Sequence, residues 1–390
     1  MAKEMDWSNI DQINKARRRK EKRFRLYSMA AIFLAGAFLV FFLGDIVTKG
    51  YPAFWQTKIQ VEVSYNEASK RISYNAVERQ YEELVSRGYL RLIPRRMDDN
   101  PDLMGTTRTE WVLATAEVDQ YIKGKPNRLS PAEKEVVDRL ESEGRAEAFF
   151  NFAFFTNGDS KLPEFSGIKA AAVGSFYVIL LTFLFSFPIG VMCAIYLEEY
   201  APDNRLTQII EVNINNLAAI PSILFGLLGL AIFINFFEVP RSSALVGGLT
   251  LSLMTLPIII IATRAAIRAI PDSIREGALA LGATRWQVIW HHVLPLSLPG
   301  ILTGTIIGLA QAMGETAPLL IVGMMAYIPE APDGVTEATT VLPAQIYTWS
   351  SSALRAFSSR TAAGIIVLLF ILLSMNGLAI WLRNKYERKW

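Results

Sequence analysis

Residues 276–300 read EGALALGATRWQVIWHHVLPLSLPG and lie between two strongly apolar segments of the chain. Small residues gather in the first half of this stretch, at Gly277, Ala278, Gly282 and Ala283. Small side chains allow another surface to approach a backbone closely. A short segment of mixed character has little reason to stay out of a bilayer unless something binds it. We therefore expect a docking loop here.

Six stretches of the sequence are long and apolar enough to cross a bilayer as helices, since each crossing takes about 20 mostly apolar residues. Only the fifth carries a full charge well inside, at Glu315. Hydrophobic residues make up 52% of the chain, which argues against a large soluble protein with buried helices. The sequence predicts an all-α polytopic membrane protein with six transmembrane helices. The six stretches are 27–47, 170–197, 217–237, 244–262, 300–326 and 361–382.

The orientation follows from the basic residues, because short basic flanks stay in the cytoplasm. The run from Lys15 to Arg25 precedes the first span, and Arg383 and Lys385 follow the last, so both termini are expected inside. The segment Glu198 to Asn216 is the weak point, since it is acidic although it should also lie inside. The predicted parts are a basic N-terminus 1–26, a first span 27–47, an external insertion 48–166, a five-helix core 167–385 with a cytoplasmic loop 268–300, and a tail 386–390.

The basic run before the first span has two other interpretations, a patch for nucleic acid or lipid and a cleaved secretion signal. A basic run directly before an apolar span is most often a topology signal. No small-residue cleavage site follows Gly44 and Asp45, and the apolar stretch is long for a signal peptide. We expect the first span to be retained.

The insertion has an ordinary soluble composition and should fold as a mixed α+β domain. Alternating apolar residues predict a strand at Ile59–Tyr65, and the Phe-rich Ala148–Thr156 predicts another. Helical spacing occurs at Ala76–Arg87 and Glu110–Lys123. The best-marked helix is Pro131–Glu143, after the capping box that Ser130 opens. The segment holds neither His nor Cys and no catalytic set, so we expect a structural or partner-facing domain.

Several chemistries are excluded by residue counts. Cys193 is the only cysteine, and His291 and His292 are adjacent, so they cannot both reach one metal ion from one helix face. No phosphate-binding loop ending in Gly-Lys-Ser/Thr occurs, since Gly124-Lys125 leads into proline. We therefore expect no metal site and no cofactor bound by this chain. If it pumps a substrate, the energy must come from a partner.

The loop resembles the EAA loop of ABC importer permeases, in which a short helix fits a groove of the ATPase. Gly277 stands where a second Ala is usual and His292 where an Ile is usual. We expect Pro271 and Pro295 to bracket the helical turn, with the small residues open to the partner. The residues that carry this resemblance are Glu276, Gly277, Ala278, Gly282, Ala283, Leu294 and Pro295.

Two further runs resemble the A-type membrane subunit of phosphate ABC importers, EVNINNLAAIPSILFG at 211–226 and MGETAPLL at 313–320. The resemblance extends from about Asp159 to the C-terminus, and the insertion is longer than in many relatives. It implies a MetI-like core in a bacterial inner membrane that imports phosphate by alternating access. It also implies a similar C-type permease subunit, a pair of ATPase subunits that hold ATP and Mg, and a periplasmic phosphate-binding protein.

Phosphate is an anion, so its path needs hydrogen-bond donors at helix breaks or on polar side chains. An intramembrane carboxylate is costly and needs a partner. Members of the family that this chain resembles often carry an Arg four residues before this Glu, and this chain has Gln311 there. We therefore expect either a cation from the partner permease or a Glu315 kept neutral by burial, and favour the first. The candidates are Asn213, Asn215, Asn216, Pro221, Gln311, Glu315 and Thr316, although Asn and Gln also join helices.

Three alternatives remain. An ABC permease for another oxyanion would have the same loop and spans. A secondary transporter would also have broken helices, but it should show two similar halves and has no need of the Glu276 loop. A membrane-anchored sensor or enzyme would have no reason to place Glu315 in a span. Co-purification of ATPase subunits would separate the first from the other two.

Overall fold

The computed structural model describes residues 7–386 and divides into two compact units, residues 1–49 and 50–390. The described part of the first unit is the helix α1 (Trp7–Gly50) up to Lys49, which carries the predicted first span and the basic run Lys15–Arg25. The first six residues and the predicted tail from 387 onward lie outside the described residues. The second unit contains the insertion and the remaining spans.

Within residues 7–386, five helices are long and apolar enough to cross a membrane, and a bent pair supplies a sixth span. The four long helices of the second unit are α7 (Lys169–Ile195), α10 (Ala244–Arg268), α13 (Leu294–Gly314) and α16 (Ala356–Tyr386). The bent pair is α8 (Arg205–Ala218) with α9 (Ser222–Gly229), which continues as the π-helix η6 (Leu230–Ile234). The fold is a polytopic helical membrane protein, as predicted.

The third span, predicted at 217–237, is a bent pair that begins earlier, at Arg205. The helices α8 and α9 meet at an angle of 104°. Pro221 stands between them and precedes the first residue of α9. Proline lacks an N–H group and disfavours helical backbone in the residue before it, so the chain turns here.

The fifth span was also predicted wrongly, at 300–326. Its helix begins earlier, as α12 (Arg285–Val288) and the π-helix η7 (Ile289–Val293), and ends with α13 at Gly314. Glu315 has extended backbone, with φ −75° and ψ 126°, and the short helix α14 (Ala317–Ile321) follows. Pro318 lies in the first turn of α14 and cannot continue α13. Glu315 and Thr316 therefore lie at a helix break and not in the middle of a helix.

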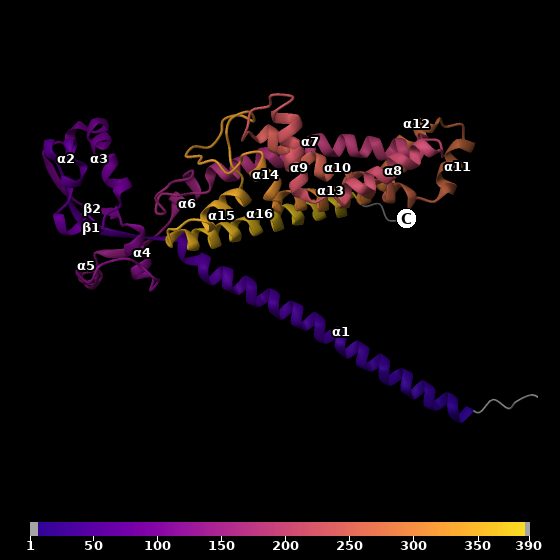
Figure 1. Cartoon of the computed structure of the whole chain (residues 1–390), viewed down its shortest axis with the longest axis horizontal. Coiled ribbons are helices and arrows are strands. Elements are labelled where there is room, and N and C mark those ends of the chain that lie inside the picture. Colours follow the sequence, from indigo (N-terminus) through magenta and orange to yellow (C-terminus); the bar gives the residue numbers. More distant parts are fainter. Residues whose placement is uncertain (1–6, 387–390) are drawn as a thin grey trace, which may run out of the picture. The chain divides into compact units, whose positions relative to one another are not determined.

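The helices of the bundle pack through small residues. A side chain at Gly300 or Gly248 would collide with Ala266 on α10 or Leu181 on α7. Such close contacts are how membrane helices associate, because lipid gives no hydrophobic driving force between them. In Figure 1, α11 (Asp272–Ala280) and α12 lie at one end of the bundle and α6 (Phe152–Thr156) lies towards the other. The helix α15 (Leu342–Ser350) packs on α16.

The insertion is built on a three-stranded antiparallel sheet of order β2-β1-β3, with β1 (Trp55–Tyr65) in the centre. Its partners are β2 (Thr106–Leu113) and β3 (Ala146–Phe150). Ile59 and Tyr65 of β1 are fully buried against helices that cover one face. The helical segments are η1 (Tyr51–Phe54), α2 (Glu67–Arg71), η2 (Ser73–Ala76), η3 (Arg79–Tyr81), α3 (Arg87–Asp99), η4 (Pro101–Leu103), α4 (Ala116–Ile122) and α5 (Pro131–Ser142).

The local predictions for the insertion have mixed outcomes. The strand at Ile59–Tyr65 is confirmed as part of β1, and the capped helix is confirmed as α5, with Ser130 and Glu133 forming the capping box. The helix predicted at 76–87 is wrong, since 3-10 turns occupy that region. The helix predicted at 110–123 is half strand, because β2 pairs with β1 through Leu113 and α4 begins only at Ala116. The strand predicted at 148–156 ends at Phe150, where Asn151 caps α6.

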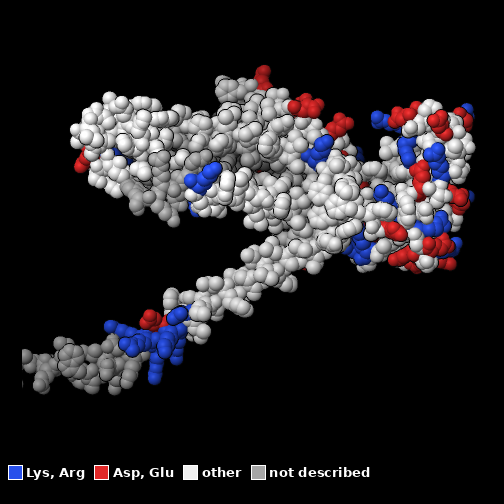
Figure 2. Space-filling view, turned by 180° about the vertical axis from the view of Figure 1, so that it is seen from behind, with Lys and Arg blue, Asp and Glu red and all other residues white. Residues whose placement is uncertain are grey.

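Charged side chains are distributed unevenly over the second unit. Figure 2 shows them gathered over the insertion, whereas the visible face of the helix bundle is largely uncharged. This distribution fits a bundle that faces lipid and an insertion that faces water.

Candidate functional site

The predicted docking loop is a short helix followed by a tight turn. The helix α11 follows Pro271 and its backbone reverses at Gly282, where φ is +83°. A side chain is strained in that conformation, so glycine suits the position. Glu276, Gly277 and Gly282 are exposed, and space is open around the Cβ positions of both glycines. The backbone here is accessible to a second protein.

Not every predicted loop residue faces outward. Ala278 is 8% exposed and packs against Ile267, Ile270 and Val293 of its own unit, and Ala283 is half-buried beside them. Ala278 therefore holds α11 on the bundle and does not offer a surface to a partner.

Leu294 and Pro295 do not end the loop as predicted, because a single helical path runs from Arg285 to Gly314. Pro295 lies in the first turn of α13, directly after the π-helix η7. Proline leaves a carbonyl one turn earlier without its helical donor, and a wider π turn accommodates this. The turn that ends the docking helix is at Gly282.

An apolar surface lies beside the glycines and was missed by the sequence analysis. Leu281 is 91% exposed, and Leu279 is also exposed. The exposed rings of Trp286 and Trp290 stack with their centroids 5.4 Å apart. Large exposed apolar side chains close together in sequence indicate a site of protein interaction. We name this the coupling surface; its residues are Glu276, Gly277, Leu279, Leu281, Gly282, Trp286 and Trp290.

A network of ion pairs lies behind the coupling surface. Arg264 of α10 is 9% exposed and contacts Glu198 and Glu211, each at 2.5 Å. Arg268 also contacts Glu198, at 2.7 Å. Glu198 belongs to the π-helix η5 (Tyr196–Tyr200), which continues α7, and Glu211 belongs to α8. One buried guanidinium therefore joins three elements.

The helix α11 is joined to η5 by a further ion pair. Arg275 of α11 contacts Glu199 at 3.0 Å and donates to the backbone carbonyls of Ile267 and Ile270. In the sequence, these acidic residues stood out only as an exception to the predicted topology. The excess of acid in 198–211 and of Arg in 264–285 is the signal that could have predicted their pairing. These pairs form the second part of the site.

The two helix breaks meet inside the bundle. The Cβ that a side chain would add at Gly226 of α9 lies 2.7 Å from the Cα of Pro318 of α14. Only glycine allows this approach. Phe225 and Leu319 pack in the same apolar cluster. The turn after Ala219 and the turn at Glu315 are thus held against each other by the short helices that follow them.

The predicted path residues form two separate groups. Asn213, Asn215 and Asn216 lie on the exposed face of α8, and Asn213 donates to the carbonyl of Ile209 on its own helix, at 2.7 Å. Pro221 is exposed at the α8–α9 turn. Gln311 is exposed near the end of α13, and Glu315 and Thr316 are half-buried at the break. Among the described residues, no hydrogen bond joins the two groups and none reaches the Glu315 carboxylate.

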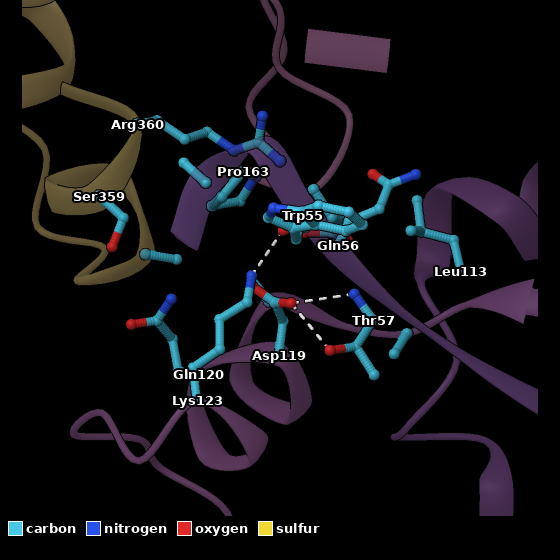
Figure 3. Close-up of a pocket in the computed structure, with 15 residues that line it drawn as sticks. Trp55, Gln56, Thr57, Leu113, Asp119, Gln120, Lys123, Pro163, Ser359 and Arg360 are labelled. Carbon is cyan, nitrogen blue, oxygen red and sulfur yellow. Dashed lines mark hydrogen bonds and ion pairs between the residues drawn. The ribbon is translucent and has the colours of Figure 1, made fainter. Parts of the chain in front are cut away.

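A small polar pocket lies where the insertion meets α16 (Figure 3). Asp119 accepts hydrogen bonds from the backbone and hydroxyl of Thr57, at 3.0 and 2.9 Å. Lys123 contacts the same carboxylate at 2.6 Å. Burial lowers the pKa of Lys123 despite this acid. The pocket volume of about 20 Å³ has room for about one water molecule.

Hydrogen bonds at and beside this pocket join the insertion to α16. Arg360 of α16 is 7% exposed and donates to the carbonyl of Ser166, at 2.5 Å. Lys125 of the insertion donates to the hydroxyl of Ser359, at 2.6 Å. A buried guanidinium without its contacts is costly. These bonds fasten the insertion to the first turns of α16.

The structure combines a bundle of spans, two broken helices and an exposed docking surface. This combination is typical of a membrane transport component. The comparisons with known proteins identify its family. Residues 186–388, more than half of the chain, match the binding-protein-dependent transport system inner membrane component. The chain belongs to this family. Residues 11–98 and 66–132 match a domain of unknown function, DUF3333.

Relatives match the chain over part of its length. The probable ABC transporter permease protein YqgI of Bacillus subtilis is 35% identical over 44% of this chain and 58% of its own length, so the chain spans under two thirds of that relative. The phosphate transport system permease protein PstA of Haemophilus influenzae is 31% identical over 57% of this chain and 77% of its own length. A structure of the inward facing MetNI methionine ABC transporter is 20% identical with a TM-score of 0.43, covering 55% of this chain and 95% of that chain.

Proposed function

We propose that this chain is the membrane permease subunit of an ATP-driven importer that moves inorganic phosphate into the cytoplasm by alternating access. It works with a C-type permease subunit, a dimer of ATPase subunits and a periplasmic phosphate-binding protein. It lies in a bacterial inner membrane with both termini in the cytoplasm and the insertion in the periplasm. The observation that carries the proposal is the combination of an open coupling surface with a break in two spans.

The coupling surface supports the need for an ATPase partner. The sequence has no phosphate-binding loop, so this chain does not supply the nucleotide site. Leu281 and the stacked Trp286 and Trp290 are apolar groups that a partner would remove from water. The open glycines beside them let a groove approach the backbone.

The ion pairs supply a route from the ATPase to the membrane path. Movement of α11 acts on Glu199 through Arg275, and Arg264 joins the neighbouring Glu198 to Glu211 of α8. The helix α8 ends at the turn before Pro221, so a shift of α8 changes one of the two breaks. Such a network transmits a motion when its elements have two stable arrangements.

Phosphate as the substrate is supported by the relative PstA of Haemophilus influenzae, whose name states phosphate transport. The turns that break α8–α9 and α13–α14 free backbone N–H groups, which an anion can accept from. Glu315 is an unfavourable neighbour for an anion. Because its carboxylate contacts no cation among residues 7–386, we infer that an Arg of the C-type subunit pairs with it in the complex.

The proposal is tested by phosphate uptake into vesicles that hold the full four-component transporter. We expect ATP-dependent uptake of labelled phosphate. The uptake rate of a Glu315→Gln variant should be at least about tenfold lower, since an intramembrane charge contributes a few kcal/mol. The ATPase should still co-purify with the variant. Glu141→Gln, an exposed change on α5, is the control and should transport normally.

Two results would contradict parts of the proposal. Normal phosphate uptake by Glu315→Gln would remove this residue from the mechanism. Uptake of sulfate or molybdate without uptake of phosphate would replace the substrate by another oxyanion and leave the transport class intact. Failure of any ATPase to co-purify would overturn the class itself.

A further inference from the structure

Aromatic residues form a continuous exposed patch on the insertion. Phe152 is 70% exposed, and Phe155, Phe150 and Trp55 are 40%, 39% and 37% exposed. The ring of Phe150 contacts the other three, with centroids 4.8 Å from Phe152, 5.8 Å from Trp55 and 6.1 Å from Phe155. We name these four residues the aromatic patch. Four touching exposed rings indicate an interaction site.

The patch is fixed at the ends of the membrane helices. Phe154, on the same short helix as Phe152, is fully buried against Ile168, Trp349 and Phe357. The backbone of Ile168, which precedes α7, donates to the carbonyl of Phe154, at 2.8 Å. Phe357 lies in the first turn of α16. The patch therefore lies beside the first turns of α7 and α16.

The chain path gives the same placement independently. Gly50, the first residue of the second unit, lies against α16, because a side chain there would collide with the backbone of Ala362 and Ala363. Trp55 follows five residues later, and five extended residues span at most about 17 Å. Trp55 is thus held close to the outer end of a span by covalent connection.

We propose that the aromatic patch is a membrane anchor, which lies in the interfacial layer of the lipid surface and fixes the insertion on the bilayer. Aromatic rings concentrate at the level of lipid headgroups, where an apolar ring and its polar surroundings are both accommodated.

The proposed anchor explains why the exposed rings gather at one end of the sheet. Phe150 ends β3 and Trp55 begins β1, and Phe152 and Phe155 follow on α6, so the patch lies at the end of the sheet nearest the spans. The opposite end of β1, at Tyr65, is paired with Thr106 and lies away from that junction. The insertion would therefore contact the bilayer at this end of the sheet, and its remaining surface would face the aqueous side.

Spin labelling of the full chain in vesicles of phosphatidylethanolamine and phosphatidylglycerol tests this proposal. Cys193→Ala removes the only native thiol, and Phe152→Cys or Phe155→Cys supplies the labelled site. We expect collisions with oxygen, which concentrates in lipid, to exceed collisions with a water-soluble nickel chelate severalfold. Arg95→Cys is the control, because the Arg95 side chain is 81% exposed on α3 and should show the reverse ratio.

The outcomes distinguish lipid from the other occupants. A ratio at residue 152 equal to that at residue 95 would mean that the patch faces water, and the proposal fails. Low collision rates with both reagents would mean that protein covers the patch, and the proposal also fails. Two labelled positions keep the test valid if one variant does not fold. Neither result depends on phosphate transport, so the proposed function stands or falls separately.

Discussion

The insertion and the coupling end of the second unit, which comprises η5, α8, α11 and α12, are built in opposite ways. Away from the aromatic patch, the insertion buries apolar residues such as Leu84 and Leu90 completely and leaves ion pairs such as Arg87–Glu83 exposed. The coupling end buries its ion pairs around Arg264 and leaves Leu281 and Trp286 exposed. Apolar burial is the main favourable term of folding in water.

The difference shows which region is complete by itself. An insertion with a closed apolar core has little need of another chain for stability. A region that exposes large apolar side chains and buries charge is one whose surface is finished by a partner. Substitutions should therefore have different consequences at the two ends, and each prediction below tests this contrast.

The largest expected effect is on transport, from a bulky residue on the coupling surface. Gly282→Trp should abolish ATP-dependent uptake because its ring fills the space where the partner must approach, while the chain remains folded. Gly282→Ala is the control, since it has the same unfavourable φ of +83° without the bulk. Uptake and ATPase rate are measured in the same vesicles. Substrate-stimulated hydrolysis that persists in Gly282→Trp would contradict the coupling assignment.

The next effect is on the buried ion pairs. Arg264→Ala should reduce the stability of the chain by up to about 3–5 kcal/mol, because among the described residues it leaves Glu211 without a cation and Glu198 with Arg268 alone. Arg268→Ala is the matched control, since that side chain is 62% exposed and should cost about 1 kcal/mol or less. Thermal unfolding in detergent compares them. Equal midpoints of thermal unfolding for the two variants would show that the ion pairs of Arg264 contribute no more to stability than the exposed pair of Arg268.

The core of the insertion should respond as a soluble domain does. Leu90→Ala removes a fully buried side chain of α3 and should cost about 2–5 kcal/mol through the lost transfer energy and the cavity. Leu92→Ala, on the same helix but 44% exposed, should cost about 0.5 kcal/mol or less. Proteolysis of the insertion in the intact chain measures both. A small loss for Leu90→Ala would mean that the insertion depends on another chain.

The smallest expected effect is a pH dependence within the insertion. Burial raises the pKa of Glu110, but the hydroxyl of Tyr65 and the charge of Arg96 outweigh it, so the pKa lies below its usual value of 4.5. The folded state then binds fewer protons than the unfolded state, and stability is lost as the pH falls through the folded pKa. Glu110→Gln should flatten this loss in proteolysis between about pH 5 and 3. An unchanged dependence of proteolysis on pH would show that Glu110 does not cause the loss of stability at low pH.

Local sequence signals predicted those elements whose cause is local. The capping box at Ser130 and the alternation along β1 depend on residues close in sequence, and both were recognised. The strand β2 was missed because its pairing with β1 joins residues far apart, for example Val63 and Arg108. Phe152 was assigned to a strand because aromatic residues favour strands, although Asn151 before it caps a helix.

The site was predicted only in part, for a similar reason. Apolar length predicts that a segment can cross a bilayer but not the direction it takes, so the bend of 104° before α9 could not be measured from composition. Pro318 close after Gly314 is a local signal that would have placed Glu315 at the end of a helix. The pairing of Arg264 with Glu198 and Glu211 depends on tertiary packing, and the sequence showed only that opposite charges were present.

The π turn η7 sets the rotational phase of α13. A π turn contains about one residue more than an α turn, and one residue corresponds to about 100° of rotation about the helix axis. The faces of α13 are therefore rotated relative to α12 from where an uninterrupted α-helix would place them. With this phase, Ile301 and Thr305 point into the bundle and Gly304 meets Ala262 of α10. A single inserted residue thus orients the helix that ends directly before Glu315.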